Sequence, residues 1–199
     1  PRLEFVDRDG YPFSYAFALE GVLFVSLDVT KVGTLDEAQR RWLDELLAAH
    51  GKRYRHRVVF SHLPIYPFTD GRESEVSADH ELERILRRHQ VELYLSGHHH
   101  AYYPGYHGGI RFVSQACLGA GPRPLIGTGS RAGRAITVLE FPEQGSITIG
   151  ALGGPRFRDP VEIGGLPQRI ESRFGTLLRD DLRPREPAAA SRPLAVAPR

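Results

Sequence analysis

Histidines with metal-binding chemistry occur at two places in this 199-residue chain. The segment GHHHAYYPG contains His98, His99 and His100 in succession, and His62 lies in the segment VVFSHLPIY. Imidazole nitrogen is a good ligand for Zn, Fe, Mn or Ni. In an extended turn, His98 and His100 would point to one side and His99 to the other. The alternative interpretation is a solvated turn and an ordinary histidine at the end of a strand.

The segments before these histidines are predicted to be buried parallel strands. Short apolar runs at 21–28, 55–62 and 91–97 have the composition of such strands. Helical periodicity is expected after a capping box at Thr34 and Glu37, and again after an N-cap at Ser77 or Asp79. Parallel strands joined by helices bring their carboxyl ends to one edge of the sheet, where ligands bind. His62, His98 and His100 are therefore expected to meet at that edge.

The second half of the chain has a different pattern. Strands are predicted at 110–116, 135–141 and 146–152, with glycine-rich turns and no helices between them, which favours an antiparallel section. Residues 155–199 are rich in Arg, Pro and Ala and are predicted to form a largely disordered tail, with 167–182 as a short helix if any part folds. We therefore expect one domain at 1–154 and a tail at 155–199.

Composition excludes some classes of function. The net charge of +2 comes from arginines in the tail, so the body shows no basic surface of the kind that binds nucleic acid. No run approaches the length of a membrane-spanning helix, and the first residues do not have the pattern of a signal peptide. The single cysteine, Cys117, has no partner for an intramolecular disulfide. None of these features indicates a cellular compartment.

Two short motifs resemble those of a known enzyme family. VVFSH matches the V-x-x-H element, and GHHH the G-H-x-H element, of the calcineurin-like dinuclear metallophosphoesterases. The segments TLDEAQRRWLDELL and VELYLSGHHHAYY are most similar to the purple-acid-phosphatase-like branch, and the resemblance extends from about Phe13 to Leu152. It implies a four-layer αββα sandwich in which two metal ions (Fe, Mn or Zn) activate a hydroxide that attacks a phosphoryl group. By motif, His62 and His98 would bind one ion and His100 the other.

The first motifs of that family have no counterpart here. The chain contains no D-x-H, and it contains no Asn, so the family's G-N-H motif cannot be present. We therefore expect this chain to correspond to the C-terminal half of the domain. Its function would be metal-dependent hydrolysis of phosphoric esters by the parent domain. The alternatives are a catalytically inactive module that binds a metal or a partner, and a complement to a separately encoded N-terminal half.

Several other residues are weaker candidates. Asp28 is the carboxylate best placed to help bind metal, although a role in the following loop is the more conservative interpretation. Tyr102, Tyr103 and His99 are candidate residues of a substrate cleft for a phosphate ester, with packing beneath the turn as the alternative. The loop at 63–77 is a candidate determinant of substrate choice. Uncovered strands predict either self-association or pairing with the missing half.

Overall fold

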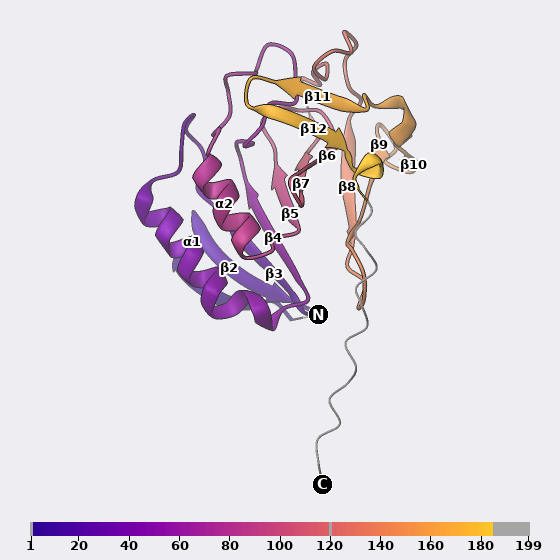
Figure 1. The fold of residues 1–199 in the computed structure, drawn as a ribbon. Coiled ribbons are helices and arrows are strands. Elements are labelled where there is room, and N and C mark those ends of the chain that lie inside the picture. The colour runs from indigo at the N-terminus through magenta and orange to yellow at the C-terminus, as the bar shows by residue number, and fades with distance from the viewer. Residues whose placement is uncertain (1, 120, 185–199) are drawn as a thin grey trace.

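A large mixed sheet forms the centre of the molecule. The computed structural model describes residues 2–119 and 121–184, and within them nine strands form this sheet. Figure 1 shows the arrangement. In spatial order the strands are β1 (Glu4–Gly10), β2 (Ser14–Leu19), β3 (Val22–Ser26), β4 (His56–Ser61), β5 (Leu93–Ser96), β7 (Ile110–Ser114), β6 (Tyr103–His107), β12 (Gly175–Arg179) and β11 (Arg169–Ser172).

The parallel core predicted from the sequence is confirmed. Strands β3, β4 and β5 pair in parallel and are joined by helices α1 (Glu37–His50) and α2 (His80–Arg88). A short 3-10 turn, η1 (Gly51–Arg53), follows α1. Asp79 caps α2 as expected, because its carboxylate accepts from the backbone N–H of Leu82 at 2.9 Å. The capping box predicted at Thr34 is wrong, since Asp36 caps α1 by accepting from the Gln39 N–H at 2.8 Å.

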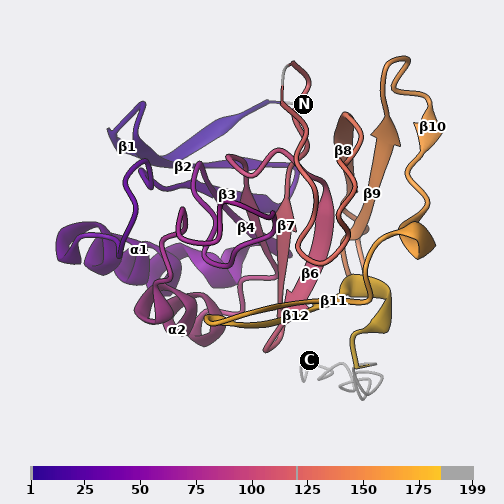
Figure 2. The ribbon, with the colours of Figure 1, turned by 90° about the horizontal axis from the view of Figure 1, so that it is seen from above.

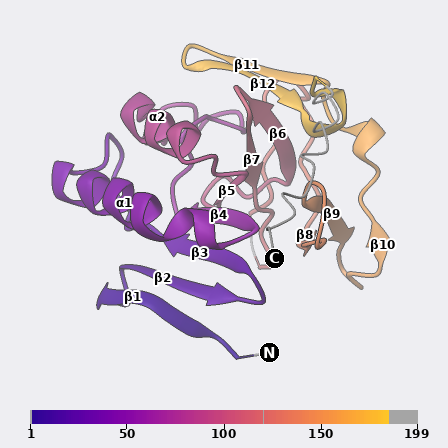
Figure 3. The same cartoon turned by 60° about the horizontal axis from the view of Figure 1, so that its bottom comes forward.

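Different layers cover the two faces of the sheet. Leu23 and Val25 of β3 point into a core shared with the helices, which includes Leu43 of α1. Val22 belongs to a second core on the opposite face, formed with a small antiparallel sheet. Its strands are β8 (Ala135–Glu140), β9 (Thr148–Gly153) and β10 (Asp159–Pro160). Figure 3 shows the two helices apart from this small sheet, with the main sheet between them.

An aromatic row lies on the face that carries the small sheet, next to the free edge at β1. Neighbouring rings are 5.0–6.2 Å apart, and Phe5 and Tyr11 remain 42% and 59% exposed. Rings at such distances attract each other beyond the area that they bury. The members of the row are Phe5, Tyr11, Tyr15, Phe17 and Phe24.

The region after residue 100 differs in part from the prediction. The predicted strand at 110–116 is present as β7, but it runs parallel to β5 and antiparallel only to β6. Strand β6 was not predicted, because its Pro104 and Gly105 are unusual within a strand. Gly108 and Gly109, with φ of 55° and 93°, form the tight turn that joins β6 to β7. Strands β8 and β9 pair antiparallel as expected.

Part of the predicted tail is ordered in strands. Residues 167–182 contain the hairpin β11–β12 rather than a short helix, and β12 pairs with β6. Ile170 and Leu177 pair across the hairpin and are each 1% exposed, so this segment buries apolar side chains in the core on the helix side. The 3-10 turns η2 (Ile163–Gly165) and η3 (Asp180–Leu182) flank it. The prediction of disorder at 185–199 falls outside the described residues.

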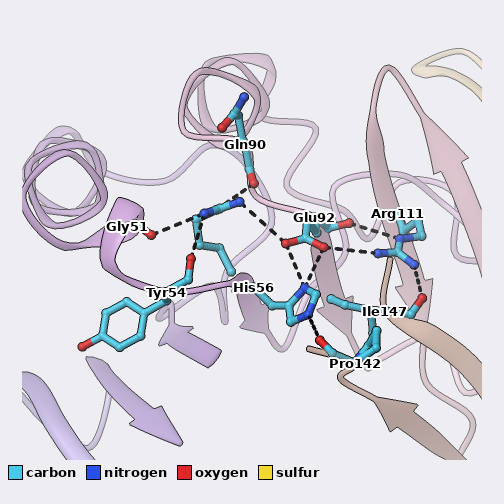
Figure 4. A network of polar contacts seen from close by, with 9 residues as sticks. Gly51, Tyr54, His56, Gln90, Glu92, Arg111, Pro142 and Ile147 are labelled. Carbon is cyan, nitrogen blue, oxygen red and sulfur yellow. Dashed lines mark hydrogen bonds and ion pairs between the residues drawn. The ribbon is translucent and has the colours of Figure 1, made fainter. Parts of the chain in front are cut away.

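A polar network ties the β8–β9 hairpin to the amino ends of β4 and β5, at the end of the sheet away from His62 and His98 (Figure 4). His56 lies 3.0 Å from Glu92 through Nδ1, and its Nε2 donates to the carbonyl of Pro142 at 2.8 Å. Arg111 is 5% exposed and donates to the carbonyls of Ile147 and Glu92. Because the hairpin is held at its turn, the small sheet is fixed against β4, β5 and β7.

Among the described residues, no helix has the length and apolarity needed to cross a membrane.

Candidate functional site

The carboxyl ends of β4 and β5 bring two of the predicted ligands together. His62 follows β4 directly, and His98 follows β5 after Gly97. The Gly97 N–H donates to the carbonyl of His62 at 3.0 Å, so the two segments are joined through the backbone. The Nε2 atom of His62 lies 3.1 Å from the Nδ1 atom of His98.

The ring of His98 is oriented by a carboxylate that the sequence analysis did not single out. Glu75 Oε2 lies 2.5 Å from the Nε2 atom of His98. An ionised carboxylate only accepts, so His98 donates to it from Nε2, and Nδ1 is the nitrogen that faces His62. Arg72 lies 3.2 Å from the same Nε2 atom and forms an ion pair with Glu75. The hydrogen bond to His98 is the largest of the effects that lower the pKa of the Glu75 carboxyl.

His100 lies near this pair but is held by a different segment. Its Nδ1 atom lies 3.1 Å from the carbonyl of Gly121 and 3.0 Å from Nη1 of Arg123. A single nitrogen cannot donate to the carbonyl and accept from the guanidinium together, so the tautomer decides which contact forms. Burial lowers the pKa of His62, and the charges of His98 and His100 lower it further, because all three imidazoles share one region.

The turn that carries these histidines is not extended, contrary to expectation. His98 and His100 have φ of 63° and 57°, in the left-handed region. Histidine adopts this region more often than most residues, and strained backbone of this kind gathers at functional sites.

His99 and Tyr103 do not fit the predicted role in a substrate cleft. His99 is 0% exposed, accepts from the Phe68 N–H at 3.0 Å and lies 3.2 Å from the Glu75 carbonyl. Burial lowers its pKa to about 4, so the ring is neutral and joins the 63–77 loop to the turn. Tyr103 is also 0% exposed and donates to the carbonyl of Pro167 at 3.1 Å. Tyr102 lines a cavity that is described below.

Asp28 serves its own loop. Its side chain accepts from the hydroxyl of Thr30 at 3.0 Å, and its backbone N–H and carbonyl both bond to the Gln39 side chain. These contacts agree with the conservative interpretation of this residue. No hydrogen bond or ion pair joins Asp28 to the histidines within the described ranges.

The histidines fit part of a metal site. Two nitrogens bound at neighbouring positions on one ion, at about 2.0–2.1 Å each, lie roughly 3 Å apart. The 3.1 Å between His62 Nε2 and His98 Nδ1 agrees with that separation, and Glu75 holds the other nitrogen of His98 as carboxylates do for metal-binding histidines. Within residues 2–119 and 121–184, however, no three His, Cys, Asp or Glu side chains form a group that could hold an ion.

A cavity opens beside the two histidine segments. Its volume is about 280 Å³, and Ser61 and Gly97, the neighbours of His62 and His98, form part of its wall. Phe60, Leu95 and Leu139 give it an apolar side. A small group bound near the histidines would be partly shielded from water here.

Sequence reasoning missed two residues that contact the histidines. Glu75 lies in the loop proposed to determine substrate choice, but its pairing with His98 depends on how that loop folds back. Arg123 lies in a loop rich in Gly and Pro, and no local pattern relates it to His100.

Comparison with known proteins places the fold. No family model matches the chain, and no curated protein matches it. A purple acid phosphatase isolated from yellow lupin (Lupinus luteus) seeds superposes with a TM-score of 0.57 and 13% identity, over 70% of this chain and 30% of that chain.

Two further structures match with a TM-score of 0.42. GAP50, the anchor in the inner membrane complex of Plasmodium, is 15% identical over 71% of this chain and 46% of its own. A dimetal phosphatase from Danio rerio is 21% identical over 64% of this chain and 37% of its own. This chain therefore spans less than half the length of each of the three proteins.

The fold is thus mixed α/β, with a large sheet and parallel core strands, and it matches part of the metallophosphoesterase fold. The structural resemblance to calcineurin-like metallophosphoesterases covers part of those chains and is a likeness of fold.

Proposed function

We propose that this chain contributes histidine ligands to a metal-dependent phosphoric-ester hydrolase of the purple-acid-phosphatase-like branch. The observation that carries the proposal is the pair His62 and His98, whose facing nitrogens lie 3.1 Å apart while Glu75 holds the opposite nitrogen of His98. This combination is typical of imidazoles that bind a metal ion.

The three histidines are divided between two ions in the proposed centre. His62 and His98 would hold one ion, and His100 would hold a second ion, each of them Fe, Mn or Zn. When bound, such ions polarise a phosphoryl oxygen and generate a hydroxide nucleophile. Arg72 and Arg123, which lie within 3.2 Å of His98 and His100, would supply positive charge for the phosphoryl oxygens of the substrate.

The remaining ligands would come from outside this set of residues. Neutral imidazoles do not offset the charge of two metal ions, and a two-metal centre commonly has a bridging carboxylate. We propose that a complementary N-terminal half supplies it and covers the aromatic row, of which Phe5 and Tyr11 are exposed. The shared length supports this, since the chain covers 30% of the yellow lupin phosphatase.

Metal content per chain after purification tests the ligand assignment. We expect about one ion per wild-type chain, because His62 and His98 fit two positions of one site. His62→Ala and His98→Ala should lose the ion, while His80→Ala, at an exposed position at the start of α2, should retain it. Absence of metal from the wild-type chain with added Zn, Mn or Fe, both alone and after the N-terminal half is supplied, would overturn the assignment.

A second candidate function is a non-catalytic module that binds a metal or a partner. It is favoured by the fact that no group of three ligands forms among the described residues. Hydrolysis of 4-nitrophenyl phosphate with added Mn, Fe or Zn separates the two functions. Bound metal with turnover that disappears in His98→Ala supports the hydrolase, and bound metal without turnover, even after the N-terminal half is supplied, supports the module.

A further inference from the structure

A second cavity, which shares no lining residue with the first, lies on the small-sheet side of the molecule. Its volume is about 290 Å³. Its wall combines the segment at 128–135, the end of β9 at Gly153 and the turn η2 near Gly165. Figure 2 shows β8 and β9 side by side, with β10 beyond them. Three segments that are distant in sequence therefore enclose one space large enough for a small molecule.

Positive charge lines this cavity without a matching carboxylate. Arg131 and Arg134 both belong to its wall, and no Asp or Glu among the described residues does. Arg134 is positioned through its Nε atom, which donates to the carbonyl of Gly119 at 2.6 Å. Arg131 is exposed and forms no ion pair with any other described residue. Asp180, whose charge helps to raise the pKa of Tyr102, is itself paired with Arg183 at 2.6 Å.

The wall also contains a tyrosine hydroxyl that forms no hydrogen bond within the described residues. Tyr102 is 5% exposed and lines the cavity, yet its hydroxyl makes no hydrogen bond to a residue in the described part of the chain. The neighbouring Tyr103 instead donates to the carbonyl of Pro167. The phenol of Tyr102 is therefore a donor available to a molecule in the cavity.

We propose that this cavity binds a small organic anion. The carboxylate or phosphate group of the ligand would lie against Arg131 and Arg134, because guanidinium groups bind these anions through paired N–H donors. Its apolar body would pack against Leu125, Val161 and Leu166, which belong to the same wall. The proposal does not depend on the metal-binding assignment, since none of these residues contacts His62, His98 or His100.

Calorimetric titration of the full chain with phenyl phosphate and with benzoate, in the presence of a chelator, tests this site. We expect binding of at least one probe, and the tighter probe identifies the anionic group that the site prefers. Arg131→Ala should weaken that binding by about tenfold or more, and Tyr102→Phe by several-fold, because each loses a hydrogen bond to a charged group. Arg53→Ala, at an exposed arginine of η1, should leave the affinity unchanged.

Three results would overturn the proposal. The first is that neither probe binds the wild-type chain. The second is equal affinity in the wild type and Arg131→Ala, with Tyr102→Phe also unchanged. The third is loss of binding in His62→Ala, which would place the anion at the histidines instead. The chelator excludes bound metal, so failure here leaves the metal-content experiment unaffected.

Discussion

Four buried tyrosines should make the protein lose stability steeply above about pH 10. Tyr66, Tyr94, Tyr102 and Tyr103 are 2%, 1%, 5% and 0% exposed. Burial raises the pKa of Tyr102 to about 12 and raises the pKa of the other three. Above about pH 10 such a phenol ionises in the unfolded chain but stays protonated in the folded protein, so the folded state binds more protons than the unfolded state. A rise in pH above the pKa of tyrosine in the unfolded chain therefore favours unfolding.

The size of the effect follows from the shift. At about pH 11, one unit above the ordinary tyrosine pKa, each phenol that remains protonated in the folded protein lowers the free energy of unfolding by about 1.4 kcal/mol. Four independent groups give roughly 5–6 kcal/mol, which is comparable with the whole stability of a typical domain, about 5–15 kcal/mol. We therefore expect alkaline unfolding near about pH 11 and no contribution from these groups below about pH 9.

Urea unfolding at several pH values, with tyrosinate absorbance recorded alongside, measures this loss. Tyr94→Phe lowers stability at neutral pH, because it removes the 2.6 Å hydrogen bond to Ser61. The decrease in its free energy of unfolding between neutral pH and about pH 11 should nevertheless be smaller than that of the wild type by about 1.4 kcal/mol. Tyr11→Phe, at a tyrosine that is 59% exposed, should leave the pH dependence unchanged. Equal pH dependence for all three proteins, or ionisation of all eight tyrosines near their ordinary pKa in the folded state, would refute the reasoning.

Three further predictions follow from the same contacts. Glu75→Gln should weaken Zn binding, measured by titration calorimetry, by about 10–100-fold, whereas Glu73→Gln, in the same loop and exposed, should not change it. Arg111→Ala should lower the free energy of unfolding by about 1–3 kcal/mol in urea, because it leaves the Ile147 carbonyl without its charged donor, whereas Glu92 keeps its contacts with His56 and Arg57. The isolated chain should self-associate through its exposed aromatic rings, and Phe5→Ser should shift analytical ultracentrifugation toward monomer; an unchanged distribution would place association elsewhere.

The parallel core could be predicted because its signals are local. Apolar runs followed by helical periodicity identify β3, β4 and β5, and the sequence order fixes their direction. The hairpin β11–β12 could not be predicted in the same way. It lies among Arg, Pro and Gly, and its two apolar side chains, Ile170 and Leu177, become buried only when β12 pairs with β6. A strand specified by long-range pairing leaves little trace in its own composition.

The same division applies to the site. That His62 and His98 meet follows from two strand ends sharing one edge, and such an argument needs only the order of the elements. The tasks of the individual histidines depend on the loops instead. His99 is buried because Phe68 and Glu75 fold back over the turn, and alternation along an extended segment cannot anticipate a left-handed backbone at His98 and His100.

Glu75 therefore links the structural and proposed functional parts of the turn. Its backbone carbonyl lies 3.2 Å from the buried His99, while its side chain lies 2.5 Å from His98. One residue thus contributes both to the position of the turn and to the orientation of a candidate ligand. A substitution that removes only the charge, such as Glu75→Gln, keeps the backbone contact to His99. A loss of metal affinity without a loss of stability in that variant would separate the two contributions, because the fold depends on the carbonyl and the ligand on the carboxylate.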